Sequence, residues 1–476
     1  MALEDVRKFA VLDWGRTLWP MRTERIIFTH FHELLNRTCE DAGIFKDSKT
    51  DVDGVRPANM LFAAKHGHHC RRSVKPDPLA AWFLYRWAYE NRNSFRRPHY
   101  KHRSHFGYRL VEGAPISIEA ASTKFRRAEF YAEQHRKLLT LRFDIGHYFN
   151  TLYHHDIVKQ LRLSGFTPEP VRQLARVLRW LTAGRTIDCL PQGIYPAKMI
   201  GSYVLTPVDN DAGIGSWRLF RMMDDFLLVD ADWQRLIGDF HHLQYLLGQL
   251  SLGVNQDKTR MPTAPPATDL ALSDEERSTE EIVKSVQDKT EAKARVRLRF
   301  TRRIPPKSAR DLARTIAVAL DHPDLVKQLS FWFRTVRNKD ELGDVLWSAL
   351  KSRFLTDYQL FWLAHIADEH LLETASLGKV VDFVFKHPNA SDITKARILE
   401  IPTNKFGMAA RREIYLRQTT GWTSWAAGIG MLNAPKDSRN QLAKYVKNDG
   451  IMGRMMSQVI HNLDPQAHAI DWSTCL

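Results

Sequence analysis

The spacing of hydrophobic positions changes along the chain. Up to about residue 90 they recur at helical intervals, as in Ile26, Ile27, Phe31 and Leu34, which is typical of amphipathic helices. From about residue 138 to 260, short apolar runs alternate with helical patterns, which indicates strands mixed with helices. From Ser308 onward amphipathic segments such as DLVKQLSFWFRTV follow one another through short turns. The pattern predicts an α+β region followed by an all-α domain of irregular, HEAT-like helix pairs.

Residues 261–292 interrupt this periodicity. MPTAPPATDL is rich in proline and SDEERSTEE is charged and free of aromatic residues, a composition typical of a linker. The chain therefore divides into a helical N-terminal region (1–90), a mixed region (91–260), a linker and basic connector (261–304) and a helical domain (305–476).

The connector contains KARVRLRFTRR, in which cations and apolar residues alternate. Period two would place Lys293, Arg295, Arg297 and Arg299 on one face of a strand. Such a face would either lie along a phosphate backbone or protect a solvent-exposed edge strand.

The net charge indicates what the protein binds. Its 476 residues carry 69 Lys and Arg against 54 Asp and Glu, a formal charge of +15, which favours nucleic acid first and an anionic membrane surface second. Hydrophobic residues make up 44% of the chain, which excludes a disordered protein. The four cysteines form no CxxC pair, so we expect neither a zinc site nor a disulfide framework. With no signal peptide and no long apolar run, we expect a cytoplasmic protein without a membrane span.

A basic stretch from Arg92 to Arg109 holds six Arg or Lys and no acid, interleaved with four aromatic residues. Together with the connector it predicts binding to a nucleic-acid backbone that weakens steeply with salt. The candidate contacts are Arg96, Arg97, Lys101, Arg103, Arg295, Arg297 and Arg299.

Three segments carry candidate chemistry. In LLTLRFDIGHYFNTL an apolar strand ends at Asp144, and LPQGIYPAKMIGSYVL is a turn that opens a helix. In RLFRMMDDFLLVD, Asp224 and Asp225 separate two apolar runs, which predicts a β-hairpin with both acids at its turn. Paired acids are common in surface turns, but adjacent carboxylates flanked by buried strands repel each other unless a cation compensates. Carboxylate oxygens suit Mg²⁺, and three of them can hold two ions about 4 Å apart.

The ordered set of Asp144 and Phe149, LPQG, MMDD and LGVNQDKT resembles the palm motifs of reverse transcriptases, in particular the bacterial branch. The match covers residues 95–260. It implies right-hand polymerase fingers and palm, and transfer of nucleotides from dNTPs to a 3′-hydroxyl or a protein hydroxyl. It also implies two Mg²⁺ ions, with Mn²⁺ as a substitute.

The resemblance implies a role for individual residues. Asp144, Asp224 and Asp225 would be the metal-binding catalytic acids, with the Ile145 carbonyl as a further ligand. Phe149 would be the steric gate against a ribose 2′-hydroxyl. Gln192 would lie beside the incoming nucleotide, Gly193 would allow close backbone approach, and Lys258 would lie near the pyrophosphate. The cations that hold the triphosphate should come from among Arg109, Lys124, Arg126 and Arg127.

Some positions depart from the family pattern. Met222 stands where the family has an aromatic residue that supports the primer end, and Ala197 and Ser202 replace a frequent Ser and Asn. None of these changes removes a metal ligand, but they point away from ordinary templated, processive copying.

The long helical extension resembles that of the abortive-infection and defence-associated reverse transcriptases of bacteria. This implies an antiphage role, an RNA template or non-coding RNA, a DNA product, and a homo-oligomer or a complex with an accessory protein or RNA. Three alternatives stay open. The first is a conventional templated reverse transcriptase of a retroelement. The second is an RNA polymerase or an untemplated terminal transferase on the same palm. The third is a catalytically silent nucleic-acid-binding scaffold.

Overall fold

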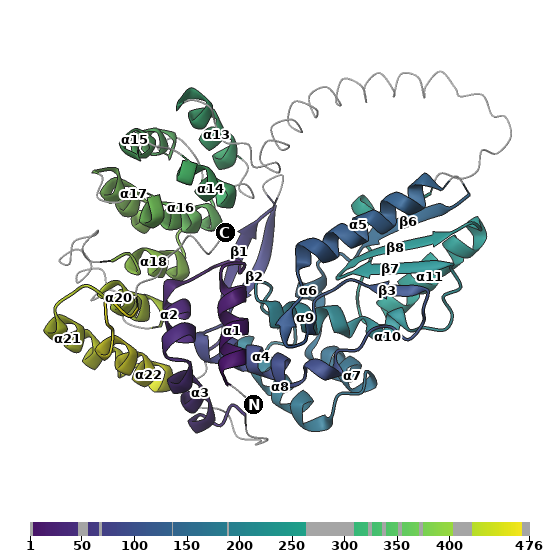
Figure 1. The fold of residues 1–476 in the computed structure, drawn as a ribbon, viewed down its shortest axis with the longest axis horizontal. Helices are drawn as coiled ribbons and strands as arrows, with labels where there is room; N and C mark the ends of the chain where they lie inside the picture. Colours follow the sequence, from purple (N-terminus) through teal and green to yellow (C-terminus); the bar gives the residue numbers. More distant parts are fainter. Residues whose placement is uncertain are drawn as a thin grey trace. The chain divides into compact units, whose positions relative to one another are not determined.

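The computed structural model describes most of the chain. The described residues are 3–45, 56–65, 69–135, 137–187, 190–262, 309–321, 326–335, 339–350, 355–370, 375–402 and 421–468. Figure 1 shows the fold of the chain. By its internal contacts the chain forms two compact units. The first comprises Met1–Phe62, Arg72–Pro262 and Leu399–Leu476, and the second comprises Ala63–Arg71 and Thr263–Ile398. The connector cations Arg295, Arg297 and Arg299 lie outside the described residues.

The N-terminal region is largely helical, as predicted. Its helices are α1 (Leu3–Trp14), α2 (Arg22–His30), α3 (His32–Asp41) and α4 (Pro78–Glu90). However, β1 (Asn59–Ala64) and β2 (Cys70–Lys75) pair as a two-stranded sheet within it. The prediction missed this sheet because NMLFAA reads as one apolar run, whereas its burial alternates and only Leu61 and Ala63 are fully buried in β1.

A four-stranded sheet lies in the mixed region, in the order β3 (Arg103–His105), β7 (Arg218–Met222), β8 (Asp225–Asp230) and β6 (Leu139–Asp144). Strands β7 and β8 are antiparallel, and Met222 pairs with Asp225 across a two-residue turn. The predicted hairpin with both acids at its turn is confirmed. Strand β6 runs antiparallel to β8 with Asp144 opposite Asp225, while β3 pairs in parallel with β7.

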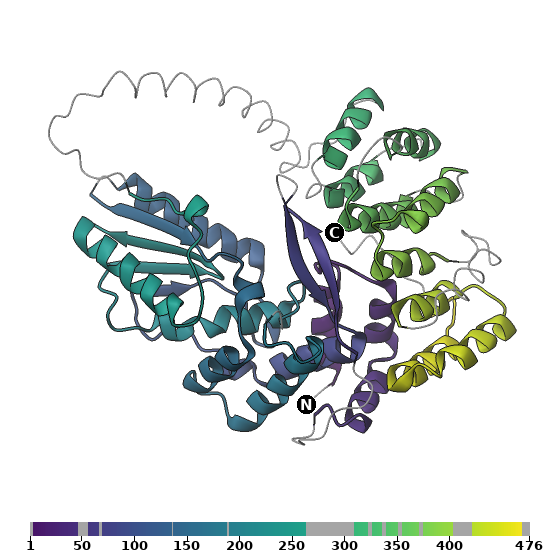
Figure 2. The same cartoon turned by 180° about the vertical axis from the view of Figure 1, so that it is seen from behind.

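A helix covers each face of this sheet (Figures 1 and 2). On one face, Phe143 of β6 stacks on Phe226 of β8 with ring centroids 4.8 Å apart and contacts Phe240 of α11 (Trp233–Gly248). On the other, Phe125 and Ala132 of α5 (Ile118–Gln134) cluster with Leu227 and Val229 of β8. Side chains alternate along a strand, so the face covered by α5 is the one that carries Asp225.

Shorter elements complete this part of the first unit. The LPQG turn leads into the helix α9 (Tyr195–Val204), as predicted. The elements are η2 (Arg92–Ser94), β4 (Leu110–Val111), β5 (Ala114–Pro115), α6 (Tyr148–Thr151), α7 (His154–Leu163), α8 (Pro168–Leu181), α9 (Tyr195–Val204), α10 (Thr206–Asp209) and η3 (Gln256–Lys258).

The described part of residues 309–398 is helical, as the sequence pattern predicts. Helices that are two apart in the chain contact each other: α13 contacts α15, and α14 contacts α16. The helices are α13 (Ala309–Asp321), α14 (Val326–Thr335), α15 (Lys339–Leu350), α16 (Asp357–His370), α17 (Ala375–Lys386) and α18 (Asp392–Leu399).

The predicted single helical domain over 305–476 requires a correction. Helices α20 (Trp422–Gly430), α21 (Lys436–Val446) and α22 (Gly450–His461) belong to the first unit, where α20 contacts α2 and α22 contacts α3. The start of α2 has no side-chain cap from its neighbours. Instead the buried Glu400 carboxylate accepts the backbone amides of Arg22 (2.9 Å) and Thr23 (2.6 Å). A helix start needs such acceptors, and here they come from a residue 378 positions further along the chain. No helix in the described ranges is long and apolar enough to cross a membrane.

Candidate active site

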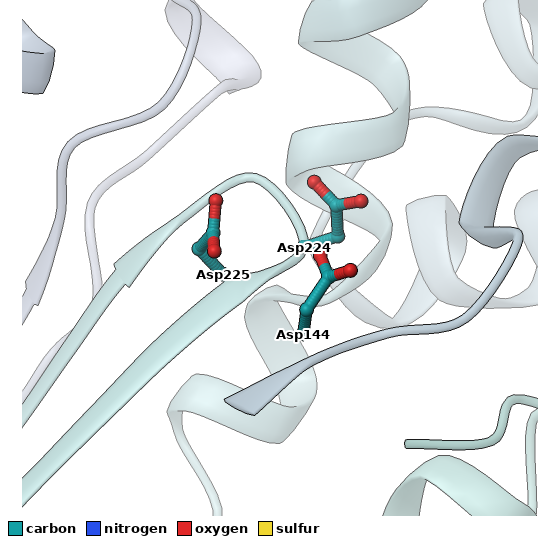
Figure 3. A group of neighbouring side chains, drawn as sticks. All are labelled: Asp144, Asp224 and Asp225. Carbon is teal, nitrogen blue, oxygen red and sulfur yellow. The ribbon is translucent and has the colours of Figure 1, made fainter. Parts of the chain in front are cut away.

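Asp144, Asp224 and Asp225 come together at one end of the four-stranded sheet (Figure 3). Each offers one carboxylate oxygen, and these oxygens all lie within 4.8 Å of one another. The strand register brings them together, because Asp144 ends β6 directly opposite Asp225. In addition, the Ile145 amide donates to the Asp224 carbonyl at 3.1 Å, which ties the end of β6 to the turn. The three acids singled out in the sequence therefore form one cluster.

The turn that carries Asp224 is held in an uncommon conformation. Met223 has φ 59°, a left-handed geometry that costs a non-glycine residue roughly 1 kcal/mol or more. The buried Arg221 guanidinium donates to the Met223 carbonyl at 2.8 Å and pairs with both carboxylate oxygens of buried Asp209. This pair fixes the turn from the face opposite the acids. Nothing in the sequence pattern points to either residue.

Lys258 lies directly on the acid cluster. Its ammonium donates to Asp144 Oδ2 at 2.5 Å. Backbone pairing positions it, because the Asn255 amide donates to the Asp144 carbonyl at 2.8 Å and Val254 forms a bridge with Ile145. The sequence predicts Lys258 near a pyrophosphate. The structure places it against a candidate metal ligand.

A second cation reaches the cluster from β6. Arg142 donates to Asp225 Oδ1 at 3.3 Å and to both carboxylate oxygens of Glu129 on α5 at 2.9 Å. Burial raises the pKa of Asp225, Arg142 opposes that shift, and the nearby Asp144 charge adds to it. Arg142 was not among the predicted site residues. It faces the acids because it stands two residues before Asp144 on the same strand.

The donor set fits divalent metal ions. Three carboxylates within reach of one another are the hard oxygen ligands that Mg²⁺ and Mn²⁺ take, and like charges this close call for a cation. Lys258 and Arg142 supply positive charge at the edges of the cluster. The carbonyl of Ile145 remains a predicted further ligand, on a residue that is itself buried.

Phe149 and Gln192 lie near each other on neighbouring segments. A Cβ at Gly201 of α9 would lie 3.0 Å from the Phe149 ring, so that glycine makes room for the predicted gate. Gln192 is buried and donates to Asn150 Oδ1 at 3.3 Å. The backbone at Gly193 does lie close to another group, but this group belongs to the chain itself. A Cβ at Gly193 would lie 3.3 Å from the Leu18 amide nitrogen. Contact of Gly193 with a nucleotide stays a prediction.

The basic stretch divides into exposed and buried cations. Arg96, Arg97 and Lys101 are exposed. Arg103 is buried and donates to the carbonyls of Asp209 (2.5 Å) and Ile214 (2.9 Å). The prediction that Arg103 contacts nucleic acid is therefore wrong, because its guanidinium holds backbone carbonyls inside the fold.

Arg109 and the cations of α5 lie in different surroundings. The half-buried Arg109 guanidinium donates to the His105 carbonyl at 3.4 Å, and burial lowers its pKa. Lys124, Arg126 and Arg127 are exposed on α5. Which of them holds a triphosphate stays a prediction.

Two solved structures are distantly similar to this chain. No model of a protein family matches the chain, and no curated protein is similar to it. The structure of telomerase from Candida albicans with a fragment of telomeric RNA is similar over 84% of this chain and 71% of that one, with 12% identity and a TM-score of 0.30. Apo telomerase from Candida tropicalis is similar over 80% and 73%, with 10% identity and a TM-score of 0.28. Scores below 0.5 do not establish a common fold, so neither likeness carries weight for function.

Proposed function

We propose that this chain is a divalent-metal-dependent nucleotidyltransferase that makes DNA from dNTPs, an RNA-directed DNA polymerase of bacterial antiphage defence. The observation that carries the proposal is the convergence of Asp144, Asp224 and Asp225, whose ligand oxygens lie within 4.8 Å of one another at the ends of neighbouring strands. Two bound Mg²⁺ or Mn²⁺ ions would supply activation of the attacking hydroxyl and neutralisation of the leaving pyrophosphate.

The chain's own residues would position the reactants. In the transfer, a primer oxygen bonds to the α-phosphorus while the bond from that phosphorus to pyrophosphate breaks. Lys258, half exposed beside Asp144, would offer its ammonium to the negative charge of the phosphates. Phe149, packed against Gly201, would meet the sugar and favour deoxyribose.

The proposed partners follow from charge and from the sequence resemblance. A formal charge of +15 and the exposed Arg96, Arg97 and Lys101 support binding of an RNA template or non-coding RNA and of the DNA product. The sequence resemblance supports antiphage defence, untemplated or protein-primed synthesis, and assembly as a homo-oligomer or with an accessory partner.

Polymerisation by the purified protein tests the activity. Mg²⁺ and labelled dNTPs are supplied with and without template and primer, to the wild type and to Asp224→Asn/Asp225→Asn. The matched control is Asp382→Asn, which removes an exposed acid of α17. Product that is lost in the double variant and kept in the control supports the site. Equal product from the double variant overturns it.

The same assay separates the alternatives. DNA made without added template favours a defence-type enzyme, whereas product that requires both template and primer favours a retroelement enzyme. Incorporation of NTPs in preference to dNTPs would favour an RNA polymerase. A scaffold role would be supported if phage protection in cells is unchanged by Asp224→Ala.

A further inference from the structure

The outward face of α5 combines positive charge with exposed aromatic rings. Lys124, Arg126 and Arg127 are exposed on it. Phe130 and Tyr131 follow with exposed fractions of 56% and 66%, and their ring centroids lie 6.1 Å apart. Exposed rings beside cations are the combination by which proteins bind single-stranded nucleic acid, since every base has a face that can stack.

The opposite face of α5 secures the helix to the sheet. Phe125 and Ala132 pack against Leu227 and Val229 of β8, on the face of the sheet that carries Asp225. A single strand of nucleic acid that approaches the acid cluster from this side therefore meets α5 before it meets the sheet. Two polar contacts join the helix to the cluster, from Glu129 to Arg142 and from Arg142 to Asp225.

The Glu129–Arg142 pair also shapes the surface charge. The Glu129 side chain is 13% exposed and binds Arg142 with both oxygens, so its negative charge is directed toward the sheet. The exposed acids of α5 are Glu119 in its first turn and Glu133 in its last. Between them the outward face carries three cations.

We infer that the outward face of α5 binds a single strand of nucleic acid. Phe130 and Tyr131 stack on bases, and Lys124, Arg126 and Arg127 neutralise phosphates. The inference rests on the proposed function for the identity of the strand, template or product, that passes the acid cluster. It gives the three cations a role along a strand and not at the nucleotide triphosphate.

Fluorescence anisotropy with the full chain tests the surface. The probes are labelled single-stranded DNA and RNA of about 20 nucleotides, longer than one such site, and a duplex of the same sequence. Phe130→Ala/Tyr131→Ala should weaken single-strand binding by about five-fold or more per ring and leave duplex binding almost unchanged, because duplex bases are already stacked. Tyr245→Ala, which removes a 64% exposed ring from α11 on the other face of the sheet, should bind like the wild type.

Salt dependence tests the cations separately. Lys124→Gln/Arg126→Gln/Arg127→Gln should lower the slope of log affinity against log salt by about 2, at about 0.7 per phosphate contact. Single-strand binding that is unchanged in both the aromatic and the cation variants overturns the inference. So does loss of self-association in sedimentation by the aromatic variant with nucleic-acid binding intact, because the face would then be an interface between copies.

These experiments can refute the α5 binding surface and the proposed polymerase activity separately. The Asp224→Asn/Asp225→Asn protein should still bind single strands through α5. If the wild type makes no product while the α5 variants lose single-strand binding, the binding surface is supported and the proposed polymerase activity is refuted. If the wild type makes product while the α5 variants bind single strands normally, the activity is supported and the binding surface is refuted.

Discussion

The Lys258 ammonium lies 2.5 Å from Asp144 Oδ2, although the lysine side chain is 55% exposed and the aspartate side chain only 8%. The exposed Lys258 side chain thus forms an ion pair with Asp144, a nearly buried acid of the candidate metal site. A metal ion bound by Asp144 would compete with the lysine for this carboxylate oxygen. We therefore expect Lys258 to balance the charge of Asp144 only until a metal ion takes over that role.

Removal of the lysine charge should have opposite effects on metal and nucleotide. In Lys258→Met, the affinity of the acid cluster for Mn²⁺ should rise by up to about tenfold, because a charge-assisted hydrogen bond no longer has to be broken. The KM for dNTPs should rise as well, because a cation near the phosphates is lost. Mn²⁺ titration followed by electron paramagnetic resonance measures the first effect and steady-state kinetics the second. Lys159→Met, at an exposed lysine of α7, is the control. An unchanged Mn²⁺ affinity would contradict the competition.

Nucleotide selection should depend on Phe149 and on the glycine beside it. In Phe149→Ala, we expect the ratio of dNTP to NTP incorporation to fall by at least about tenfold, because a pocket that loses a ring no longer rejects an added hydroxyl. In Gly201→Ala the new methyl group would lie 3.0 Å from the ring, so the ring must shift and selectivity should change in that variant too. Single-nucleotide incorporation with both sugars measures the ratio. A ratio that is the same in Phe149→Ala as in the wild type would refute the gate.

The buried pair of Arg221 and Asp209 should dominate the stability of the turn between β7 and β8. Arg221→Met leaves the Asp209 carboxylate buried without its guanidinium and frees the Met223 carbonyl. Removing one partner of a buried pair costs about 3–5 kcal/mol. Hydrogen exchange of the β7–β8 segment measures the loss. Adding Asp209→Leu should recover much of it, because the buried charge is then removed as well, and failure to recover would point to the Met223 contact as the main cause.

The free energy of unfolding of the second unit, which contains α16, should decrease at acidic pH. Burial lowers the pKa of His365 to about 4 from an ordinary value of 6.5. Between these values the unfolded chain binds a proton that the folded chain does not, so stability falls as the pH falls from about 6.5 to about 4, by about 3 kcal/mol in all. The carboxylate of Glu369 acts in the same direction, since hydrogen bonds with His365 and His370 outweigh its burial and hold its pKa below the usual range.

Hydrogen exchange of α16, corrected for intrinsic rates, should show about 2 kcal/mol of this loss between pH 7 and pH 5. His365→Gln should reduce the slope, and His461→Gln, at an exposed histidine of α22, should leave it unchanged. A slope that persists in His365→Gln would assign the pH dependence to other groups.

The acid cluster could be predicted from sequence because each acid ends or interrupts an apolar strand. Asp144 and the Asp224–Asp225 pair are visible in the pattern, and antiparallel pairing then brings them together. Their charge partners were not recognised: Lys258 was predicted near the pyrophosphate and not on Asp144, and Arg142 was not singled out, although its place two residues before Asp144 puts it on the same strand face. An arginine between apolar residues looks the same in the sequence whether it is buried or exposed.

The boundaries of the parts were harder to predict for a similar reason. Helical periodicity shows that a segment is a helix but not which other helix it packs against. Residues 399–476 look like a continuation of the preceding helices, yet they belong to the first unit. The deciding contacts, such as Glu400 with the start of α2, join residues far apart in the sequence.

The contact between Glu400 and Arg22 spans 378 positions, and this separation has a consequence for protein synthesis. Once the ribosome has passed residue 225, every acid of the cluster is present but the start of α2 still lacks its acceptor. A chain released early by a premature stop before residue 400 would thus carry the full set of acids on an N-terminal region whose second helix is uncapped. Residue 400 must be synthesised before the acceptor of that helix exists, so the start of α2 is completed long after the acid cluster has been made.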